Sequence, residues 1–482
     1  MPLDTEEPPA PSEDCLKLNI WRPSNGTKLP VMVWNFGGGL CSGYAGSRSF
    51  NGSNFALEHG VIVVTVSYRL GALGFLVSED FDGPGNGGMN GIRDIAVALK
   101  WVQRYIPYFG GDEKRVTVFG QSSGGYATCS LAVAPEAKGL FQRAILQSGP
   151  CLGGPPNKGW GPRNATYGKF VAAQIMASLN VSTLAQLRAV PAEQVQWPAY
   201  TMSDPNVAPY FPGYFEDPGF LPQPAEKLWS AGEVNVESII VGFNTKDGTA
   251  AFYSMAPTLG YVAGDKNQTN AGDYEKSMRN AWGANADAVL KQYPLSRFGG
   301  SPQRAFLQAD ADSSVICPSY QILQYAQARN LSRWAYEFAH FFPNRQRSDG
   351  FGCSNGPELD VTPPQEREDT TKLFATHGDD VKFVFGNEVA PDGLGPPNNR
   401  TVCTFTSDER ELSKQMRARW AAFATAGAPS NWPGYEGPAA EAPTLVFSTP
   451  DALGISAKRG AHAADCDFWR RLWEPPALAT YV

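Results

Sequence analysis

The most regular pattern along the chain is a series of short apolar runs that end in glycine or in polar residues. Residues 30–36 are mostly β-branched or aromatic and lead into three consecutive glycines, which predicts a buried strand followed by a loop. Residues 61–68 are apolar at both alternating sets of positions, as expected of a parallel strand covered on both faces. The same reasoning predicts strands at residues 115–119, 143–147, 238–243, 333–338 and 444–447.

Helical patterns lie between these strands. Apolar residues recur at helical spacing between residues 92 and 105, which predicts a helix with one face packed on a sheet. Residues 126–134 are also compatible with a helix, and the weakly periodic stretch 152–237 is expected to be a helical excursion that shapes a cleft. The alternation predicts an α/β fold with a doubly wound, mostly parallel sheet, in a single domain over residues 1–482.

The composition fits a globular protein that acts on small, mostly neutral molecules. Hydrophobic residues make up 42% and charged residues 18% of the chain, which provides enough apolar material for a buried core. The formal net charge of -7 disfavours nucleic-acid partners, because those partners select a basic surface. The longest apolar stretch, residues 61–77, is interrupted by polar side chains and is too short to cross a bilayer. We therefore expect a soluble protein with no membrane span.

Cysteine and histidine usage indicates disulfides rather than a metal site. The eight cysteines contain no C-x-x-C pair and the four histidines no H-E-x-x-H pattern, so we expect neither a metal ion nor another cofactor. Residues 1–7 lack the basic start and the apolar core of a signal peptide, so either that segment has been removed or the start is mis-assigned. Seven N-x-S/T sequons nevertheless predict a secreted glycoprotein, and they begin at Asn25, Asn51, Asn164, Asn180, Asn267, Asn330 and Asn399.

The strongest candidate for chemistry is Ser122, which stands between Gly120 and Gly124 in a G-x-S-x-G pattern. Glycines on either side let the backbone make a sharp strand-to-helix turn that presents the hydroxyl group. The pattern alone is a weak signal in a chain with 50 glycines. Here an apolar strand leads in and a helix-compatible segment leads out, so the context favours a nucleophile over an ordinary turn serine.

The three glycines Gly37, Gly38 and Gly39 are candidates for an oxyanion-binding loop. Ester cleavage develops negative charge on the carbonyl oxygen, and residues without side chains let backbone N–H groups reach that oxygen. With Gly43 and Glu58, the same glycines also fit a dinucleotide-binding fingerprint. A short-chain dehydrogenase of that type needs Tyr-x-x-x-Lys, and none of the 18 tyrosines has a lysine four positions later. The dehydrogenase interpretation is therefore disfavoured.

A serine nucleophile on this fold needs a carboxylate and a histidine, in the chain order Ser, Asp or Glu, His. That order excludes His59, and His340 ends an aromatic strand, where a packed structural role is the better interpretation. His462 lies among alanines with no flanking element, whereas His377 lies in a loop that enters an ordered apolar segment. His377 is therefore the predicted base. Asp247 is the predicted acid, because it follows a predicted strand, where catalytic groups of open α/β sheets gather.

Several longer motifs, in the correct order, resemble those of the type-B carboxylesterases, which are similar to cholinesterases and to some fungal lipases. The resemblance covers nearly the whole chain and implies an α/β-hydrolase fold and the hydrolysis of carboxylic esters without a cofactor. The matching segments are Glu13–Trp21, Gly37–Gly39, Phe109–Asp112, Val116–Ser122, Gln147–Gly149, the His377-Gly378 loop, Trp420–Ala424 and Trp432–Tyr435.

The resemblance also implies a role for individual residues. In the implied cycle the serine attacks the ester carbonyl, the alcohol leaves, and water hydrolyses the acyl-enzyme with the help of the same histidine. The expected partner is a small-molecule ester. The implied residues are Ser122 as nucleophile, Asp247 as orienting acid, His377 as base, and the N–H groups of Gly38, Gly39 and Ser123 as oxyanion hole.

Three departures from the family pattern lie close to the implied site. The acid is Asp where the family usually has Glu, so the loop that carries it must approach His377 more closely. Phe36 and Leu40 replace the usual residues on either side of the glycines, which is expected to change the pocket rim. Pro150 stands where the family commonly has a serine that supports the triad, so that hydrogen bond is expected to be missing.

A fourth departure lies near the N-terminus. In the family, the cysteine equivalent to Cys15 pairs with an upstream cysteine, and the enclosed loop carries the choline-binding Trp or the lipase lid. No cysteine precedes Cys15 here, so we expect a chain without the family's usual N-terminal segment and a general carboxylesterase rather than a cholinesterase or a lipase. Candidate disulfides are Cys353 with Cys403 and Cys317 with Cys466, and the sequence leaves the connectivity open.

The main alternative function is a non-catalytic, cholinesterase-like binding module, because such relatives typically lose the nucleophile. Retention of Ser122, Asp247 and His377 disfavours this alternative. A lipase-type or cholinesterase-type specificity is a second alternative within the same family. The sequence gives neither the acyl group, nor the alcohol, nor the oligomeric state.

Overall fold

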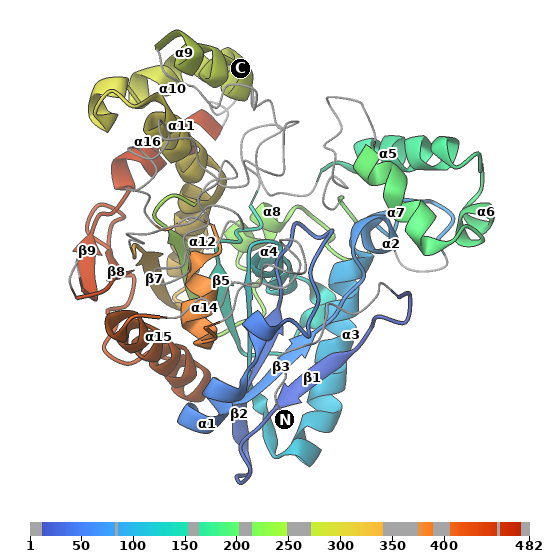
Figure 1. The fold of residues 1–482 in the computed structure, drawn as a ribbon, viewed down its shortest axis with the longest axis horizontal. Coiled ribbons are helices and arrows are strands. Elements are labelled where there is room, and N and C mark those ends of the chain that lie inside the picture. Colours follow the sequence, from blue (N-terminus) through green and yellow to red (C-terminus); the bar gives the residue numbers. More distant parts are fainter. Residues whose placement is uncertain are drawn as a thin grey trace, which may run out of the picture.

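A nine-stranded, mostly parallel sheet forms the centre of the protein (Figure 1). The computed structural model describes residues 12–81, 85–152, 163–201, 215–247, 271–340, 375, 377–388, 405–450 and 454–473. The strand order is β1-β3-β2-β4-β5-β6-β7-β8-β9, and only the edge strands β1 and β9 pair antiparallel with their neighbours. The strands are β1 (Leu18–Trp21), β2 (Leu29–Asn35), β3 (Ile62–Val66), β4 (Gly111–Gln121), β5 (Arg143–Gln147), β6 (Ser238–Asn244), β7 (Ser332–Phe338), β8 (Pro443–Phe447) and β9 (Ser456–Arg459).

The parallel arrangement brings the predicted site residues to one edge of the sheet. All five positions of β3 and all seven of β6 are buried, as expected of strands covered on both faces. Because β2, β4, β5 and β6 are parallel neighbours, their carboxyl ends lie side by side. The loops that follow β2, β4 and β6 therefore meet at the edge where open α/β sheets bind their ligands.

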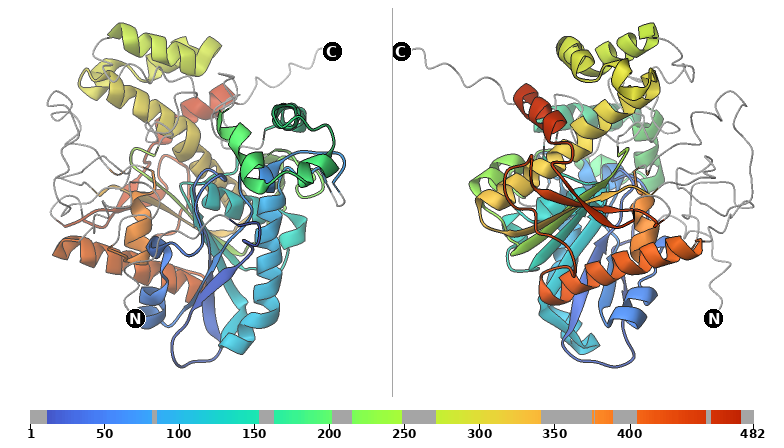
Figure 2. Two further views of the ribbon diagram at one scale, coloured as in Figure 1. Left: turned by 45° about the vertical axis from the view of Figure 1, so that its right-hand side comes forward. Right: turned by 90° about the vertical axis from the view of Figure 1, so that its left-hand side faces the viewer.

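Helices cover both faces of this sheet (Figures 1 and 2). One face carries α1 (Ser53–His59), α14 (Asp379–Phe385) and α15 (Ser407–Ala426), and the other carries α3 (Asn90–Tyr105), α4 (Ser123–Leu131), α8 (Ala225–Ala231) and α12 (Cys317–Ala328). Further helices lie beyond these layers: α2 (Gly71–Phe75), α5 (Ala165–Ser178), α6 (Leu184–Arg188), α7 (Ala192–Thr201), α9 (Ala271–Trp282), α10 (Ala286–Gln292), α11 (Pro302–Ala311) and α16 (Ala463–Trp473). None of the described helices is both long enough and apolar enough to cross a membrane.

The core consists of two groups of packed apolar side chains. The larger group surrounds the sheet and includes Trp34, Phe119 and Phe385. The smaller group joins α9, α10, α11 and α16, above the left-hand part of the sheet in Figure 1, and includes Tyr293 and Trp469. The smaller group holds α16 against the body of the protein.

Within the described residues, two disulfides link helices to other parts of the chain. Cys317–Cys466, one of the pairs considered from the sequence, joins α12 to α16. Cys129–Cys151 joins α4 to the segment after β5 and was not expected from the sequence. The other candidate pair, Cys353 with Cys403, lies outside the described residues, and Cys15 forms no disulfide with any described residue.

The α/β-hydrolase fold predicted from the sequence is confirmed. Every strand predicted from an apolar run is present, and the helix predicted over residues 92–105 occurs as Asn90–Tyr105. The stretch 152–237 contains α5, α6, α7 and α8 within its described parts, in agreement with a helical excursion. The edge strands β1 and β9 were not predicted, because no position of either strand is buried and neither has the pattern of a covered strand.

Candidate active site

Ser122 lies on a tight turn between β4 and α4. Its backbone angles, φ 56° and ψ -130°, fall in a region that side chains rarely adopt. A β-carbon on Gly120 would lie 2.5 Å from the carbonyl carbon of Gly124, and one on Gly124 would lie 2.0 Å from the Asn35 oxygen. Only glycine fits at these two positions, so the G-x-S-x-G pattern is a steric requirement of the turn.

The Ser122 side chain is buried at the carboxyl end of β4. It is only 3% exposed, and its Oγ makes no hydrogen bond within the described part of the chain. The structure therefore does not join Ser122 to His377 by a hydrogen bond. In serine hydrolases without substrate this contact is often long, and it tightens when substrate binds.

His377 and Asp247 form the closest polar contact of the candidate site. The Nδ1 atom of His377 lies 2.6 Å from Oδ1 of Asp247, and the two side chains are 3% and 0% exposed. The other carboxylate oxygen of Asp247 accepts the N–H of Asn244 at 2.8 Å. An imidazole that donates from Nδ1 to a carboxylate carries its lone pair on Nε2, as a general base requires.

The acid loop (residues 244–247) also pairs directly with the segment that carries His377. The backbone N–H of Lys246 donates to the carbonyl oxygen of Ala375 at 2.9 Å. This contact provides the close approach expected for an aspartate in place of the longer glutamate. The backbone N–H of Asn244, the last residue of β6, donates to Asp247. The sequence did not reveal this contact, because any residue type could supply a backbone N–H.

Gln147 and Asp380 link the nucleophile turn to the histidine segment. The carbonyl oxygen of Gln147 accepts the N–H of Ser122 at 2.9 Å, and its Nε2 donates to Oδ2 of Asp380 at 2.9 Å. The same Oδ2 accepts the Tyr336 hydroxyl at 2.7 Å, and burial raises the pKa of Asp380. Asp380 lies in α14, which begins two residues after His377. Gln147 belongs to a motif of the family resemblance, but its contact with Asp380 depends on the fold.

The glycine loop after β2 lies against the nucleophile turn. A β-carbon on Gly37 would lie 2.9 Å from the β-carbon of Ser122. Within the described part of the chain, the N–H groups of Gly38 and Gly39 donate to no backbone carbonyl, and both glycines have positive φ angles of 125° and 64°. Ser123 is the first residue of α4, where N–H groups have no intrahelical acceptor. These N–H groups and the positive end of the helix dipole suit an anion.

Three contacts hold the glycine loop in place. The Tyr68 hydroxyl donates to the Phe36 carbonyl oxygen at 2.7 Å, and burial raises the pKa of Tyr68, which keeps the phenol a donor. The N–H of Leu40 donates to Oγ of Ser123 at 3.2 Å. The Phe36 ring stacks on Tyr68 at 4.5 Å, and both Phe36 and Leu40 are buried. Because both side chains are buried, having Phe36 and Leu40 in place of the usual family residues changes the packing of this loop rather than an exposed pocket rim.

The other histidines have different partners. His340 is buried, with Nε2 at 2.8 Å from Oε1 of Glu409, which agrees with the structural role expected for it. His59 lies beside Glu58 on α1. His462 was expected to have no flanking element, but it directly precedes α16 and is surrounded by charged side chains.

Comparisons with known proteins agree with this fold and these motifs. Residues 2–469 match the Carboxylesterase family. Acetylcholinesterase of Bungarus fasciatus is 29% identical over 483 residues, which cover 95% of this chain and 72% of that protein. Carboxylesterase 5A of Felis catus is 30% identical over 441 residues, which cover 88% of this chain and 72% of that protein.

One further curated sequence and one solved structure are also similar to this chain. Para-nitrobenzyl esterase of Bacillus subtilis (strain 168) is 29% identical over 457 residues, which cover 90% of this chain and 79% of that protein. A solved structure of PNB esterase superposes with a TM-score of 0.71 at 27% sequence identity, covering 96% of this chain and 87% of that chain.

Proposed function

The chain belongs to the carboxylesterase family, and from this premise we propose that it hydrolyses carboxylic esters through an acyl-enzyme formed on Ser122. Members of this family are serine carboxylic-ester hydrolases. In the proposed enzyme Asp247 and His377 activate the nucleophile. The N–H groups of Gly38, Gly39 and Ser123 form the oxyanion hole.

The observation that carries the proposal is the buried contact between His377 and Asp247. As the ester carbonyl is attacked, Nε2 of His377 takes the proton of the Ser122 hydroxyl and becomes an imidazolium ion. Asp247 stabilises this ion through the 2.6 Å contact to Nδ1. The negative charge that develops on the carbonyl oxygen meets the N–H groups of the glycine loop and of α4.

The second half of the cycle uses the same side chains in reverse. His377 gives its proton to the leaving alcohol, and the acyl group stays on Ser122. A water molecule then loses a proton to His377 and attacks the acyl-enzyme, which releases the acid and restores the serine. No step needs a metal ion or another cofactor.

The proposed substrates are small carboxylic esters. Similar proteins carry the names acetylcholinesterase, para-nitrobenzyl esterase and cocaine esterase, which refer to esters with different acyl groups and alcohols. We propose the general esterase activity that these names share. An acyl-length series of p-nitrophenyl esters, from acetate to laurate, identifies the acyl group that the purified protein prefers.

The direct test compares ester hydrolysis by the wild-type protein and by Ser122→Ala. Turnover by the variant is expected to fall by about four orders of magnitude or more, because the covalent step is lost. Ser130→Ala is a matched control, since Ser130 is another buried serine of α4, and it should retain near wild-type turnover. A folded wild-type protein that hydrolyses no ester would support the non-catalytic binding module instead.

A further inference from the structure

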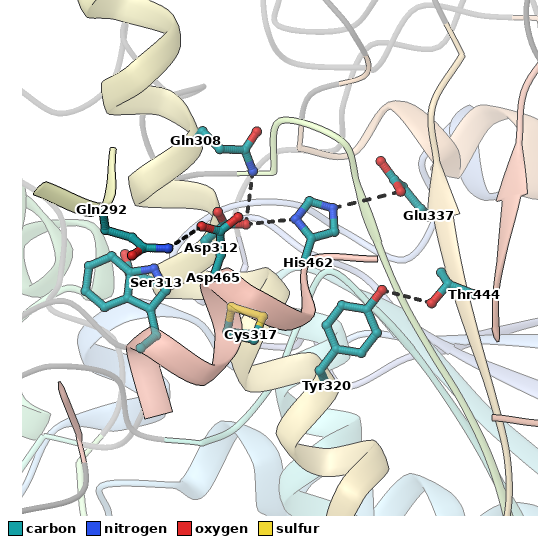
Figure 3. The surroundings of a disulfide bond; sticks show 12 residues. Gln292, Gln308, Asp312, Ser313, Cys317, Tyr320, Glu337, Thr444, His462 and Asp465 are labelled. Atoms are coloured by element: carbon teal, nitrogen blue, oxygen red, sulfur yellow. Dashed lines mark hydrogen bonds and ion pairs between the residues drawn. A yellow bond between two sulfur atoms is a disulfide. The ribbon is translucent and has the colours of Figure 1, made fainter. Parts of the chain in front are cut away.

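A second cluster of buried charges lies beside the disulfide Cys317–Cys466 (Figure 3). At its centre is His462, whose Nδ1 lies 3.1 Å from Oδ1 of Asp312 and whose Nε2 lies 3.9 Å from Oε2 of Glu337. The side chains of Asp312 and Glu337 are 0% and 6% exposed, and that of His462 is 13% exposed. The imidazole thus lies between two buried carboxylates that come from distant parts of the chain.

The carboxylate of Glu337 contacts the acid loop directly. Oε1 of Glu337 accepts the hydroxyl of Thr245 at 3.0 Å. The same hydroxyl and the backbone N–H of Thr245 both donate to the carbonyl oxygen of Phe338, at 3.3 and 3.1 Å. Thr245 is the second residue before Asp247, so the Glu337 side chain fixes the start of the loop that carries the proposed acid.

The carboxylate of Asp312 is linked to the acid loop through the side chain of Gln308. Oδ1 of Asp312 accepts Nε2 of Gln308 at 2.9 Å, and Oε1 of Gln308 accepts the Lys246 ammonium group. Lys246 immediately precedes Asp247, and its N–H makes the backbone contact with the histidine segment described above. His462 is therefore connected to both residues that precede Asp247.

The charges of this cluster balance only when His462 carries a proton. Asp312 and Glu337 provide two negative charges, and Lys246 provides one positive charge. Burial alone lowers the pKa of His462, but the hydrogen bond to Asp312 and the negative charges of Asp312 and Glu337 outweigh it and raise this pKa to about 10. A neutral residue in place of His462 leaves one buried negative charge without a partner, which is strongly unfavourable.

Internal pairing accounts for this cluster better than a bound metal ion does. Ligand atoms of Asp312, His462 and Asp465 lie within 4.8 Å of one another, which is close enough to surround a cation. However, both oxygens of Asp465 are bound by the guanidinium of Arg297, at 2.6 and 2.7 Å. Lys246 and Arg297 also place positive charge around the group, which opposes the entry of a cation.

The backbone of His462 is held as firmly as its side chain. Its carbonyl oxygen accepts the N–H of Cys466 at 2.9 Å, and Cys466 forms the disulfide with Cys317 of α12. His462 has a positive φ angle of 58°, a conformation that side-chain-bearing residues adopt only where the surrounding structure holds them. The turn therefore fixes the direction of the His462 side chain. The C-terminal helix therefore presents His462 to the two carboxylates in one fixed orientation.

We propose that His462 is a positioning residue for the catalytic acid: as a cation between Asp312 and Glu337, it fixes the carboxylates that hold the acid loop. The inference rests on the proposed esterase function. Movement of the acid loop by about 1 Å is enough to lower turnover about 100-fold, because the imidazole loses its orientation. The expected effect is on kcat more than on KM, since His462 contacts none of the proposed substrate-binding groups.

The test uses two variants and one matched control. His462→Gln keeps hydrogen-bonding capacity but removes the positive charge, and kcat for a short p-nitrophenyl ester at pH 8 should fall between about 10-fold and 100-fold. His462→Arg restores a permanent charge and should recover most of kcat. His340→Gln removes another buried histidine that pairs with a carboxylate, Glu409, and should lose stability with little change in kcat.

A pH profile separates positioning from simple destabilisation. In the wild-type protein kcat should decline as His462 loses its proton near pH 10, and in His462→Arg this decline should be absent. Asp312, Glu337 and Asp465 interact with His462 directly, and the Tyr320 ring lies 6.4 Å from its imidazole. The other charged and titratable groups, Lys246, Tyr293, Arg297 and Lys458, interact with those carboxylates. Arg297 and Lys246 are common to both proteins, so the difference between the two profiles reports on His462.

The outcomes distinguish this inference from the proposed function. A wild-type protein that hydrolyses no ester overturns both. If the wild-type protein is active, a folded His462→Gln variant with wild-type kcat overturns the inference alone, as does an equal loss of kcat in His340→Gln. If His462→Gln does not fold, Thr245→Val decides, because it removes the hydroxyl contacts with Glu337 and with the Phe338 carbonyl oxygen but leaves the backbone contact of Thr245 in place: a kcat about tenfold lower supports the inference and an unchanged kcat refutes it.

Discussion

Replacing Asp247 by Asn tests the proposed acid with the smallest change in shape. In the native protein one oxygen of Asp247 faces Nδ1 of His377 at 2.6 Å, and the other accepts the N–H of Asn244 at 2.8 Å. An asparagine oxygen can keep only one of these contacts. If it keeps the N–H of Asn244, the amide NH2 group faces Nδ1 and favours the imidazole tautomer that carries its proton on Nε2.

The size of the expected loss of kcat follows from the role of the histidine tautomer. A histidine with its proton on Nε2 cannot accept the proton of Ser122, and the equivalent change in other serine hydrolases lowers kcat about 10⁴-fold. Such a loss corresponds to about 5 kcal/mol of transition-state stabilisation, at about 1.4 kcal/mol per factor of ten. Since both side chains are almost fully buried, solvent cannot replace the missing carboxylate.

The assay measures kcat and KM for p-nitrophenyl acetate at several pH values. We expect kcat of Asp247→Asn to fall by about four orders of magnitude with KM changed less than tenfold, as for loss of a transition-state interaction. Asp247→Glu is the matched control: it keeps the charge, but its extra methylene group overpacks a fully buried position, so its loss should be much smaller. A folded Asp247→Asn protein with kcat within tenfold of wild type contradicts the assignment of Asp247 as the acid.

The remaining predictions concern stability. Gly124→Ala places a β-carbon 2.0 Å from the Asn35 oxygen, so urea unfolding should show a loss of about 3 kcal/mol or more together with loss of activity. Replacing Cys317 and Cys466 by Ser opens a loop with a sequence separation of 149, which should lower stability by up to about 5 kcal/mol and lower Tm in calorimetry. His462 has a folded-state pKa of about 10 against an ordinary value of 6.5, so its stabilising contribution is complete below pH 6.5 and disappears as pH rises to about 10. Over that window Tm of the wild-type protein should fall relative to His462→Arg, and parallel curves would contradict the charge assigned to His462.

The sequence was informative wherever a local pattern determines local structure. The apolar runs of β2 and β3 predict buried parallel strands, and the glycines around Ser122 predict the turn that holds it. Because strand-turn-helix geometry is a local property, these predictions do not depend on distant residues. The exposed edge strand β9 has no such pattern, and it forms because it can pair with β8.

Long-range contacts were the part that the sequence could not supply. The partners of His462 come from η7 (Asp312–Ile316) and from β7, and no spacing in the sequence relates Asp312 or Glu337 to a histidine near the C-terminus. The contact between Gln147 and Asp380 likewise joins residues 233 positions apart. Disulfide connectivity was open for the same reason. Secretion, glycosylation and a single domain over residues 1–482 stay predictions.

Covalent labelling of the nucleophile tests the role of Ser122 directly. The purified protein is treated with a fluorophosphonate, digested and analysed by mass spectrometry, with Ser122→Ala treated in parallel. We expect one label per chain, on the peptide that contains Ser122, loss of ester hydrolysis in proportion to labelling, and no label on the variant. A protein that hydrolyses esters while its label lies on another residue, or while Ser122 stays unmodified, would contradict the central claim.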